Sequence, residues 1–131
     1  MARITPINLG FVNAYLIDVE NGYILVDTGV SMQWRKLESA LREHGRVRGS
    51  LRLVVLTHAD MDHAGNVARV RDQYGSAIAA HSIDAEYLKT GRLPERWGES
   101  ALMRYAKRHG SHREGPQVDI LLGDGDTLEE W

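Results

Sequence analysis

The sequence contains no cysteine among its 131 residues. This absence excludes disulfide bonds, thiolate zinc sites and cysteine nucleophiles from its chemistry. An excess of one charge sign is also lacking, because 16 basic and 18 acidic side chains give a formal net charge of -2. A nearly neutral chain has no overall attraction to nucleic acid or to anionic lipid, so we expect neither as a partner.

Long apolar runs are missing as well. No stretch approaches the roughly twenty residues that cross a bilayer, and the first residues, Met-Ala-Arg-Ile-Thr-Pro, lack the apolar core of a signal peptide. No repeat or low-complexity linker divides the chain. Hydrophobic residues make up 43% of the sequence, which argues against disorder. We therefore expect a single cytoplasmic domain over residues 1–131.

The hydrophobic pattern predicts an α/β fold, in which short apolar runs alternate with segments of helical periodicity. Asn21-Gly22 predicts a hairpin turn between two of the strands. Ser31 is expected to cap the first helix. The expected strands cover residues 4–7, 12–17, 22–26, 51–56, 77–80 and 118–122, and the expected helices cover residues 31–45, 67–74, 82–89 and 99–108.

The richest feature that is present is a run of metal-capable side chains in residues 57–66, Thr-His-Ala-Asp-Met-Asp-His-Ala-Gly-Asn. Imidazole nitrogen and carboxylate oxygen together suit zinc, iron or manganese. Asp is also an ordinary turn and cap residue, so a plain polar loop is the alternative interpretation. The four candidate ligands are His58, Asp60, Asp62 and His63.

The position of this run favours a site. It directly follows the apolar strand 51–56 and precedes the helical pattern of residues 67–74, so it lies at a strand-to-helix junction. While the chain stays extended, residues two apart point to the same side, so His58, Asp60 and Asp62 line one face, and His63 joins them from the turn. Ligands bind at the carboxyl ends of strands in open α/β sheets. We therefore expect the four side chains to converge.

Two stretches resemble the metallo-beta-lactamase superfamily of metallohydrolases. Residues 58–63 are similar to its His-x-His-x-Asp-His signature at the end of a strand. Residues 11–29, which contain Asn-Ala-Tyr-Leu and end in Asp-Thr-Gly, are similar to its opening hairpin. The resemblance covers nearly the whole chain. It implies a metallo-beta-lactamase-like αβ/βα sandwich, with a mixed sheet flanked by helices.

The resemblance also implies roles for individual residues. His58 and Asp60 would hold a first metal ion, and Asp62 and His63 a second. Asp62 would orient the attacking hydroxide, and Asp27 would support the ligands through hydrogen bonds. The implied activity is attack by a metal-activated water on a small ester, thioester, lactone, lactam or phosphoester. Zinc is the expected cofactor, with two ions in the full-length protein.

One departure from the family pattern concerns the metal. Asp60 stands where the signature has its second histidine. An oxygen ligand in place of nitrogen moves the preference toward iron or manganese, although zinc also accepts carboxylate. The flavodiiron branch of the family has an acidic residue at this position. A di-iron redox centre is therefore an alternative to hydrolysis.

A second departure concerns ligands that come later in the family, in a Pro-Gly-His-Thr segment and beyond. His109 and His112 are weak matches, and Asp126 is matched to a structural position. The sequence thus resembles the N-terminal half of a metallohydrolase and is expected to be inactive alone. Half of this fold would expose a sheet face or edge, so a homodimer or pairing with the missing C-terminal half is expected. A truncated or domain-swapped module without catalytic activity is the remaining alternative. His81, at a strand-to-helix junction, is a weak candidate for substrate contact.

Overall fold

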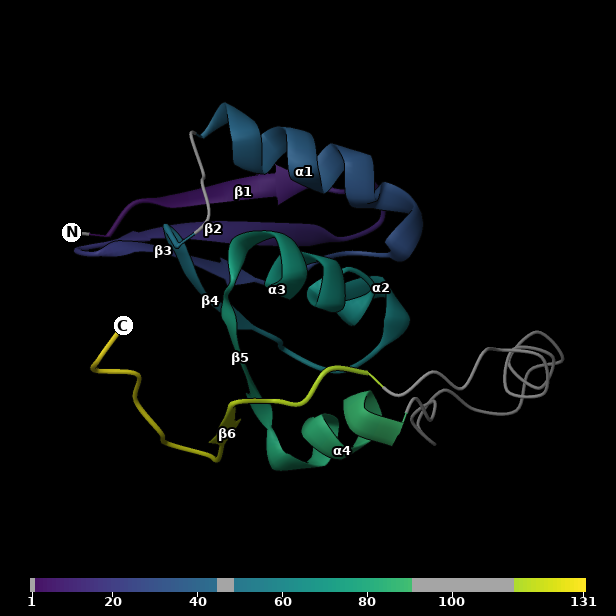
Figure 1. Ribbon diagram of the computed structural model, residues 1–131, viewed down its shortest axis with the longest axis vertical. Helices are drawn as coiled ribbons and strands as arrows, with labels where there is room; N and C mark the ends of the chain where they lie inside the picture. The colour runs from purple at the N-terminus through teal and green to yellow at the C-terminus, as the bar shows by residue number, and fades with distance from the viewer. Residues whose placement is uncertain (1, 45–48, 91–114) are drawn as a thin grey trace, which may run out of the picture.

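The computed structural model describes residues 2–44, 49–90 and 115–131, which form one mixed sheet with flanking helices (Figure 1). The strands are β1 (Ile4–Asn8), β2 (Asn13–Val19), β3 (Gly22–Val26), β4 (Leu51–Val55), β5 (Ala77–His81) and β6 (Ile120–Leu122). The helices are the 3-10 turn η1 (Ser31–Gln33), α1 (Trp34–Glu43), α2 (Met61–Ala64), α3 (Val67–Tyr74) and α4 (Ser82–Thr90).

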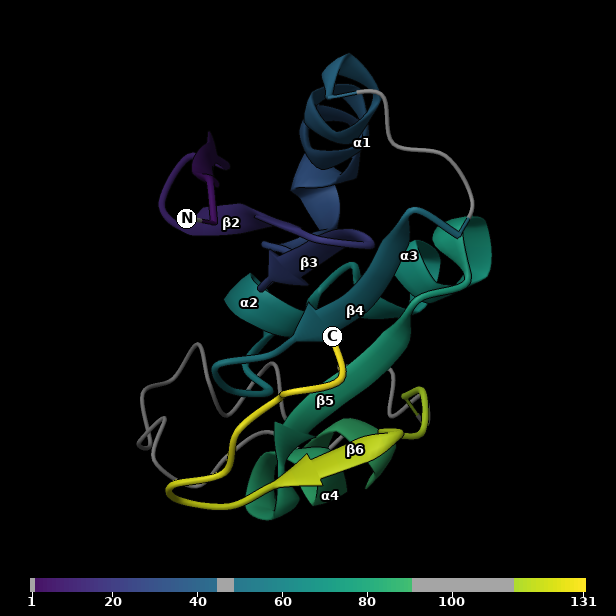
Figure 2. The same ribbon diagram turned by 90° about the vertical axis from the view of Figure 1, so that its left-hand side faces the viewer.

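The strands of the described residues follow one another across the sheet in chain order, as Figure 2 shows from β2 to β6. β1 pairs antiparallel with β2, and β2 pairs antiparallel with β3. From β3 to β6 all neighbours are parallel. Parallel neighbours end at the same edge, so the loops after β3, β4 and β5 lie side by side. This edge carries the residues 58–63.

One face of the sheet is covered by the helices. Figure 1 shows α1 beside β1 to β3 and α4 beside β5 and β6. Leu37 and Leu41 of α1 and Val70 of α3 are completely buried against this face. Full burial of such a side chain stabilises the fold by about 1.5–3 kcal/mol. These buried side chains hold α1 and α3 against the sheet.

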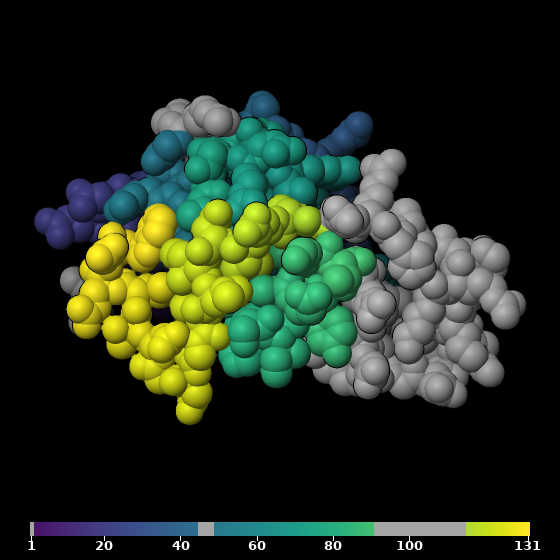
Figure 3. Space-filling view, turned by 60° about the horizontal axis from the view of Figure 1, so that its bottom comes forward, coloured from purple at the N-terminus to yellow at the C-terminus, as the bar shows by residue number. Residues whose placement is uncertain are grey.

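The other face carries a second apolar cluster. Alternate residues of the strands point there, as the two-residue period of a strand requires. The C-terminal segment 123–131 lies against it, with the Arg52 guanidinium 5.1 Å from the centre of the Trp131 ring. Figure 3 shows this segment in yellow at the surface. The cluster comprises Ile24, Leu53 and Ala79, with partly buried Ile17, Val19, Val55, Ala77, Ile120, Leu122, Leu128 and Trp131.

The start of the first helix differs from the expectation. Ser31 does not cap α1, because it opens η1 and makes no side-chain capping hydrogen bond. The Gln33 N–H donates to the Val30 carbonyl at 3.0 Å, so the backbone itself closes this turn, and α1 begins at Trp34. The hairpin predicted from Asn21-Gly22 forms, and β3 begins at Gly22 as expected, with Gly22 paired to Val19.

The helix expected over residues 99–108 lies outside the described residues, as do His109 and His112. Within the described part of the chain, no helix is long and apolar enough to span a bilayer.

Candidate metal centre

The candidate site lies where three strands end. Asp27 N–H donates to the Val55 carbonyl and Leu56 N–H donates to the Ala79 carbonyl, both at 2.9 Å, so the exits of β3, β4 and β5 are held in line. Residues 57–60 then cross this edge as a short loop before α2 begins at Met61. The sequence pattern predicted this strand-to-helix junction.

Three of the four candidate ligands converge. One donor atom from each of His58, Asp62 and His63 lies within 4.8 Å of the others. His63 Nε2 is 3.7 Å from Asp62 Oδ2, and the centres of the two imidazole rings are 4.0 Å apart. The side chain of Asp62 is 51% exposed, whereas that of His63 is 20% exposed. The cluster therefore has a protected side formed by the imidazoles and an open side at the carboxylate.

Asp60 approaches the cluster through His58. Its Oδ2 lies 3.7 Å from His58 Nε2, and the residue is buried. It occupies the N-cap position of α2 without a side-chain capping hydrogen bond, so its carboxylate does not serve the helix start. His58 therefore lies near two sets of donors, Asp60 on one side and Asp62 with His63 on the other. The expected division into one pair for each ion remains a prediction.

Asp27 connects the loop after β4 to His63 through hydrogen bonds. It is buried, and its φ of 61° lies in the left-handed region that non-glycine residues seldom adopt. Asp27 Oδ1 accepts a hydrogen bond from Thr57 N–H at 2.8 Å. Asp27 Oδ2 accepts from Thr57 Oγ1 at 2.7 Å and from His63 Nδ1 at 2.8 Å. One carboxylate therefore fixes both the start of the loop and one imidazole.

These hydrogen bonds assign the tautomers of both histidines. An ionised carboxylate can only accept, so His63 carries its proton on Nδ1. The Thr57 hydroxyl donates to Asp27 and therefore accepts from His58, whose Nδ1 is 2.8 Å away. In the neutral form of each ring, Nε2 is then the unprotonated nitrogen. This is the form in which imidazole binds a metal, oriented by a partner on its other nitrogen.

The α2 helix, which carries Asp62 and His63, is docked on the loop after Asp27. Thr28 N–H and Oγ1 both donate to the His63 carbonyl, at 2.7 and 2.9 Å. Asn66 Nδ2 donates to the Thr28 and Val30 carbonyls. A Cβ on Gly65 would lie 2.6 Å from three backbone atoms, so only glycine fits between the two segments. The sequence interpretation gave no role to Gly65 and Asn66, although both lie within the stretch 57–66.

A second carboxylate reaches the loop from α4. Asp84 Oδ1 accepts a hydrogen bond from Ala59 N–H at 3.0 Å. Sequence reasoning did not single out Asp84, because it lies 25 positions away and no local pattern marks it. His81, the weak candidate for substrate contact, is exposed, and its Nδ1 lies 3.2 Å from Ile83 N in the first turn of α4. Asp126 accepts from Gly123 N–H and closes its own turn.

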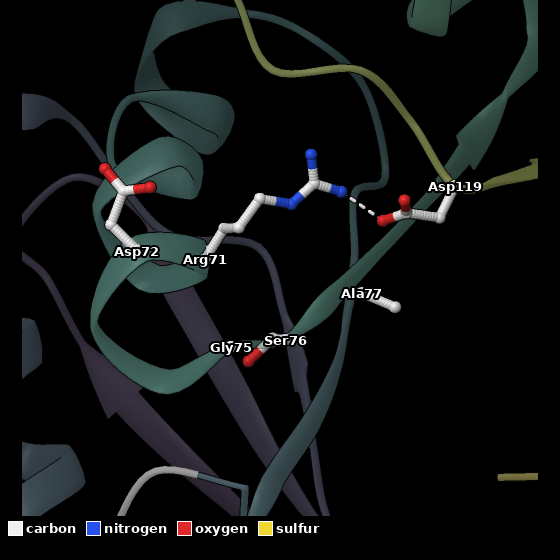
Figure 4. Close-up of a pocket in the computed structure, with 6 residues that line it drawn as sticks. All are labelled: Arg71, Asp72, Gly75, Ser76, Ala77 and Asp119. Atoms are coloured by element: carbon white, nitrogen blue, oxygen red, sulfur yellow. Dashed lines mark hydrogen bonds and ion pairs between the residues drawn. The ribbon is translucent and has the colours of Figure 1, made fainter.

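A polar pocket of about 540 Å³ lies at the opposite edge of the sheet, where β5 and β6 begin (Figure 4). Arg71 of α3 points across it to Asp119, with which it forms an ion pair. Asp119 Oδ2 also accepts from Ile78 N–H at 2.8 Å. These contacts tie β6 to α3 and β5. The pocket is therefore explained by a structural ion pair and lies away from the metal-capable cluster.

The donor set fits a metal ion. Ligands bound at about 2.0–2.1 Å in tetrahedral geometry lie roughly 3.4 Å apart. The 3.7 Å separations from His63 Nε2 to Asp62 Oδ2 and from His58 Nε2 to Asp60 Oδ2 are close to that value. Two nitrogen and one or two oxygen donors with an open, solvent-facing side correspond to a catalytic site, which keeps one position for water.

Comparison with known proteins identifies the family of this chain. The sequence model of the metallo-beta-lactamase superfamily matches residues 7–131. The chain therefore belongs to the metallo-beta-lactamase superfamily, and the expected mixed α/β sheet with flanking helices is confirmed.

Solved structures of related proteins share this fold. BJP-1, a subclass B3 metallo-beta-lactamase of Bradyrhizobium japonicum, is 23% identical with a TM-score of 0.77, over 98% of this chain and 46% of its own. A beta-lactamase from Chitinophaga pinensis is 27% identical with a TM-score of 0.76, over 97% and 45%. A Cronobacter sakazakii metallo-beta-lactamase with a HARLDQ motif is 21% identical with a TM-score of 0.76, over 94% and 44%. The chain spans less than half the length of these proteins.

Proposed function

We propose that this protein is a metal-dependent hydrolase that attacks an ester, thioester, lactone, lactam or phosphoester with a metal-activated water. The observation that carries the proposal is the convergence of His58, Asp62 and His63. Membership of a metallohydrolase superfamily supports the general chemistry. A bound metal ion lowers the pKa of water toward about 7 and polarises the bond to be cleaved.

Each residue has a distinct part in this proposal. His58 and His63 offer Nε2 atoms that are held toward the site by Thr57 and Asp27. Asp62 would be a ligand of the ion, and because its side chain is half exposed it would also be open to a hydrogen bond from water. Asp27 is buried and holds Thr57 and His63 in place through hydrogen bonds. The substrate is a small molecule, whose identity depends on loops around this edge.

Zinc is the metal we propose, with Asp60 as an additional oxygen ligand. Residues 58–63 read HADMDH. The HARLDQ motif of the Cronobacter sakazakii relative shares the first, second and fifth letters, and it too has a residue other than histidine at the third position. Departure at that position is therefore not peculiar to this chain. Iron or manganese would fit the more oxygen-rich donor set.

A second ion requires ligands from outside residues 58–63. We propose that these ligands come from a polypeptide segment that packs on the second face of the sheet. There the apolar cluster around Leu53 and Ala79 is only partly covered by residues 123–131. Ile4 and Tyr15 on the neighbouring strands are 60% and 40% exposed. A further polypeptide segment or a second copy with a complementary apolar surface would pack there and complete the site.

A di-iron redox centre is the second candidate function. The observation that favours it is the buried Asp60 carboxylate 3.7 Å from His58 Nε2, since carboxylate-rich sites suit iron. Iron content together with dioxygen consumption would identify this activity. Zinc content without oxygen consumption would exclude it.

Because residues 1–131 are expected to be inactive alone, the hydrolase proposal is tested on the native protein at its full length, purified without a tag from the cells that produce it. We expect elemental analysis to find zinc, iron or manganese in stoichiometric amount. We also expect hydrolysis of at least one of the five substrate classes, which stops when a chelator removes the metal and returns when the metal is restored. Protein that is free of metal and hydrolyses none of these substrates would contradict the proposal.

A further inference from the structure

The loop 57–60 connects β4 to α2 and carries two of the four metal-capable side chains. Its conformation decides where His58 and Asp60 point. The strand order places β4 between β3 and β5, so the connections that follow both neighbours flank this loop. Each of these two connections contributes one carboxylate to it.

The two carboxylates hold alternate peptide groups. Asp27, which follows β3, accepts from Thr57 N–H at 2.8 Å. Asp84, which lies in the first turn of α4 after β5, accepts from Ala59 N–H at 3.0 Å. The anchored residues, Thr57 and Ala59, alternate with His58 and Asp60, whose side chains approach each other to 3.7 Å. Hydrogen bonds therefore hold the backbone of the loop at Thr57 and Ala59, while the side chains of His58 and Asp60 lie next to each other.

Asp84 is well placed for this task. It is partly buried on the nine-residue helix α4, whose Leu88 packs against the core, so the carboxylate has a rigid base. The His81 imidazole lies beside Ile83 N at the start of the same helix, with Nδ1 at 3.2 Å. Functional sites need such a supporting shell, because ligands must be held close to the productive geometry before the ion arrives.

We propose that Asp84 is a positioning residue, which fixes the Ala59 peptide and thereby presents His58 and Asp60 to the metal. Its role in metal binding rests on the proposed function, but its control of the loop does not. An acidic residue in the first turn of a helix also interacts favourably with the helix dipole. That simpler role would stabilise α4 without any effect on the loop.

Two substitutions separate the roles. Asp84→Asn removes the charge and keeps an oxygen that can accept from Ala59 N–H. Asp84→Glu keeps the charge at the helix start and displaces the acceptor by one methylene group. A positioning role predicts that Asp84→Glu is the defective variant, whereas a dipole role predicts that Asp84→Asn is. Glu86→Gln, at an exposed position on the same helix, is the matched control.

The first measurement is made by NMR on the metal-free 131-residue chain. We expect Asp84→Glu to shift the Ala59 amide resonance, to speed its hydrogen exchange about tenfold, and to move the ring resonances of His58. Asp84→Asn and Glu86→Gln should leave these signals close to wild type. Unchanged Ala59 and His58 signals in Asp84→Glu would overturn the proposal, whether or not the chain binds metal.

The second measurement is the affinity for Zn²⁺ alone, by competition with a chromophoric chelator. Loss of a residue that supports a ligand typically weakens metal binding by about 10–100-fold. We expect a loss near the lower end of that range for Asp84→Glu, and less than about threefold for Asp84→Asn. Equal affinities for Asp84→Glu and wild type would contradict the role in metal binding. A wild-type chain that binds no zinc would count against the proposed function, and the NMR comparison would still decide whether Asp84 holds the loop.

Discussion

Asp27 Oδ2 accepts a hydrogen bond of 2.8 Å from Nδ1 of His63, 36 positions later in the chain. The same oxygen accepts from the Thr57 hydroxyl, which in turn lies 2.8 Å from His58 Nδ1. One buried carboxylate thus orients both imidazoles, His63 directly and His58 through the Thr57 hydroxyl. We therefore predict that cation binding by the cluster depends on a residue that is not itself among the proposed ligands.

Asp27→Asn tests this dependence. Asparagine tolerates the left-handed φ of 61°, so the substitution changes the hydrogen bonds and charge without new backbone strain. Its amide oxygen cannot replace both carboxylate oxygens, and we expect zinc affinity to fall by about 10–100-fold. Chelator competition measures the loss. Asp18→Asn, on β2 away from the site edge, serves as the control. Equal zinc affinities for the two variants would show that Asp27 does not support the metal site.

Thr57→Val and Thr57→Ser test the link to His58. Valine has nearly the shape of threonine but no hydroxyl, so His58 Nδ1 loses its acceptor and the ring is free to change tautomer. We expect about tenfold weaker zinc binding and a mixture of tautomers in the nitrogen spectrum of His58. Serine keeps the hydroxyl and should bind zinc as wild type does. A single unchanged tautomer in Thr57→Val would show that threonine does not set it.

Gly65→Ala tests the docking of α2. The added Cβ would meet Gly29 O, Met61 O and Ser31 N at 2.6 Å, and backbone atoms cannot move aside cheaply. We expect the free energy of unfolding to fall by about 3 kcal/mol, at the upper end of the usual cost of overpacking. Gly123→Ala meets only the Asp126 side chain at 3.7 Å and should change stability by less than about 0.5 kcal/mol. Urea denaturation measures the free energy of unfolding of both variants. Equal values for Gly65→Ala and Gly123→Ala would contradict the close backbone packing around Gly65.

Much of this arrangement could be predicted from the sequence. The apolar run at 51–56 and the helical spacing of Val67, Val70 and Tyr74 located the strand and helix around residues 58–63, because those signals are local. The Asp-Thr-Gly stretch drew attention to Asp27 through a resemblance. That these residues hold a metal stays a prediction until binding is measured.

Other features depend on how distant segments meet, and local sequence does not show them. Asp84 and Asn66 reach partners 25 and 38 positions away, so nothing in their own neighbourhoods marks them. Ser31 was expected to be a helix cap from its type alone, and the backbone closes that turn instead. The grouping of His58 with Asp62 and His63 likewise depends on the docking of α2 and not on the spacing along the chain.

The most direct test of the account is a zinc titration of the 131-residue chain beside its Asp62→Ala variant, with X-ray absorption to identify the ligands. Asp62 lies on the exposed side of the cluster, so its loss should leave the fold intact while it removes one donor. We predict at least one tightly bound zinc per wild-type chain, held by two imidazole nitrogens and carboxylate oxygen, and a loss of at least about tenfold in affinity for the variant. Identical zinc binding by the two proteins, or none by the folded wild type, would show that these side chains do not share a cation.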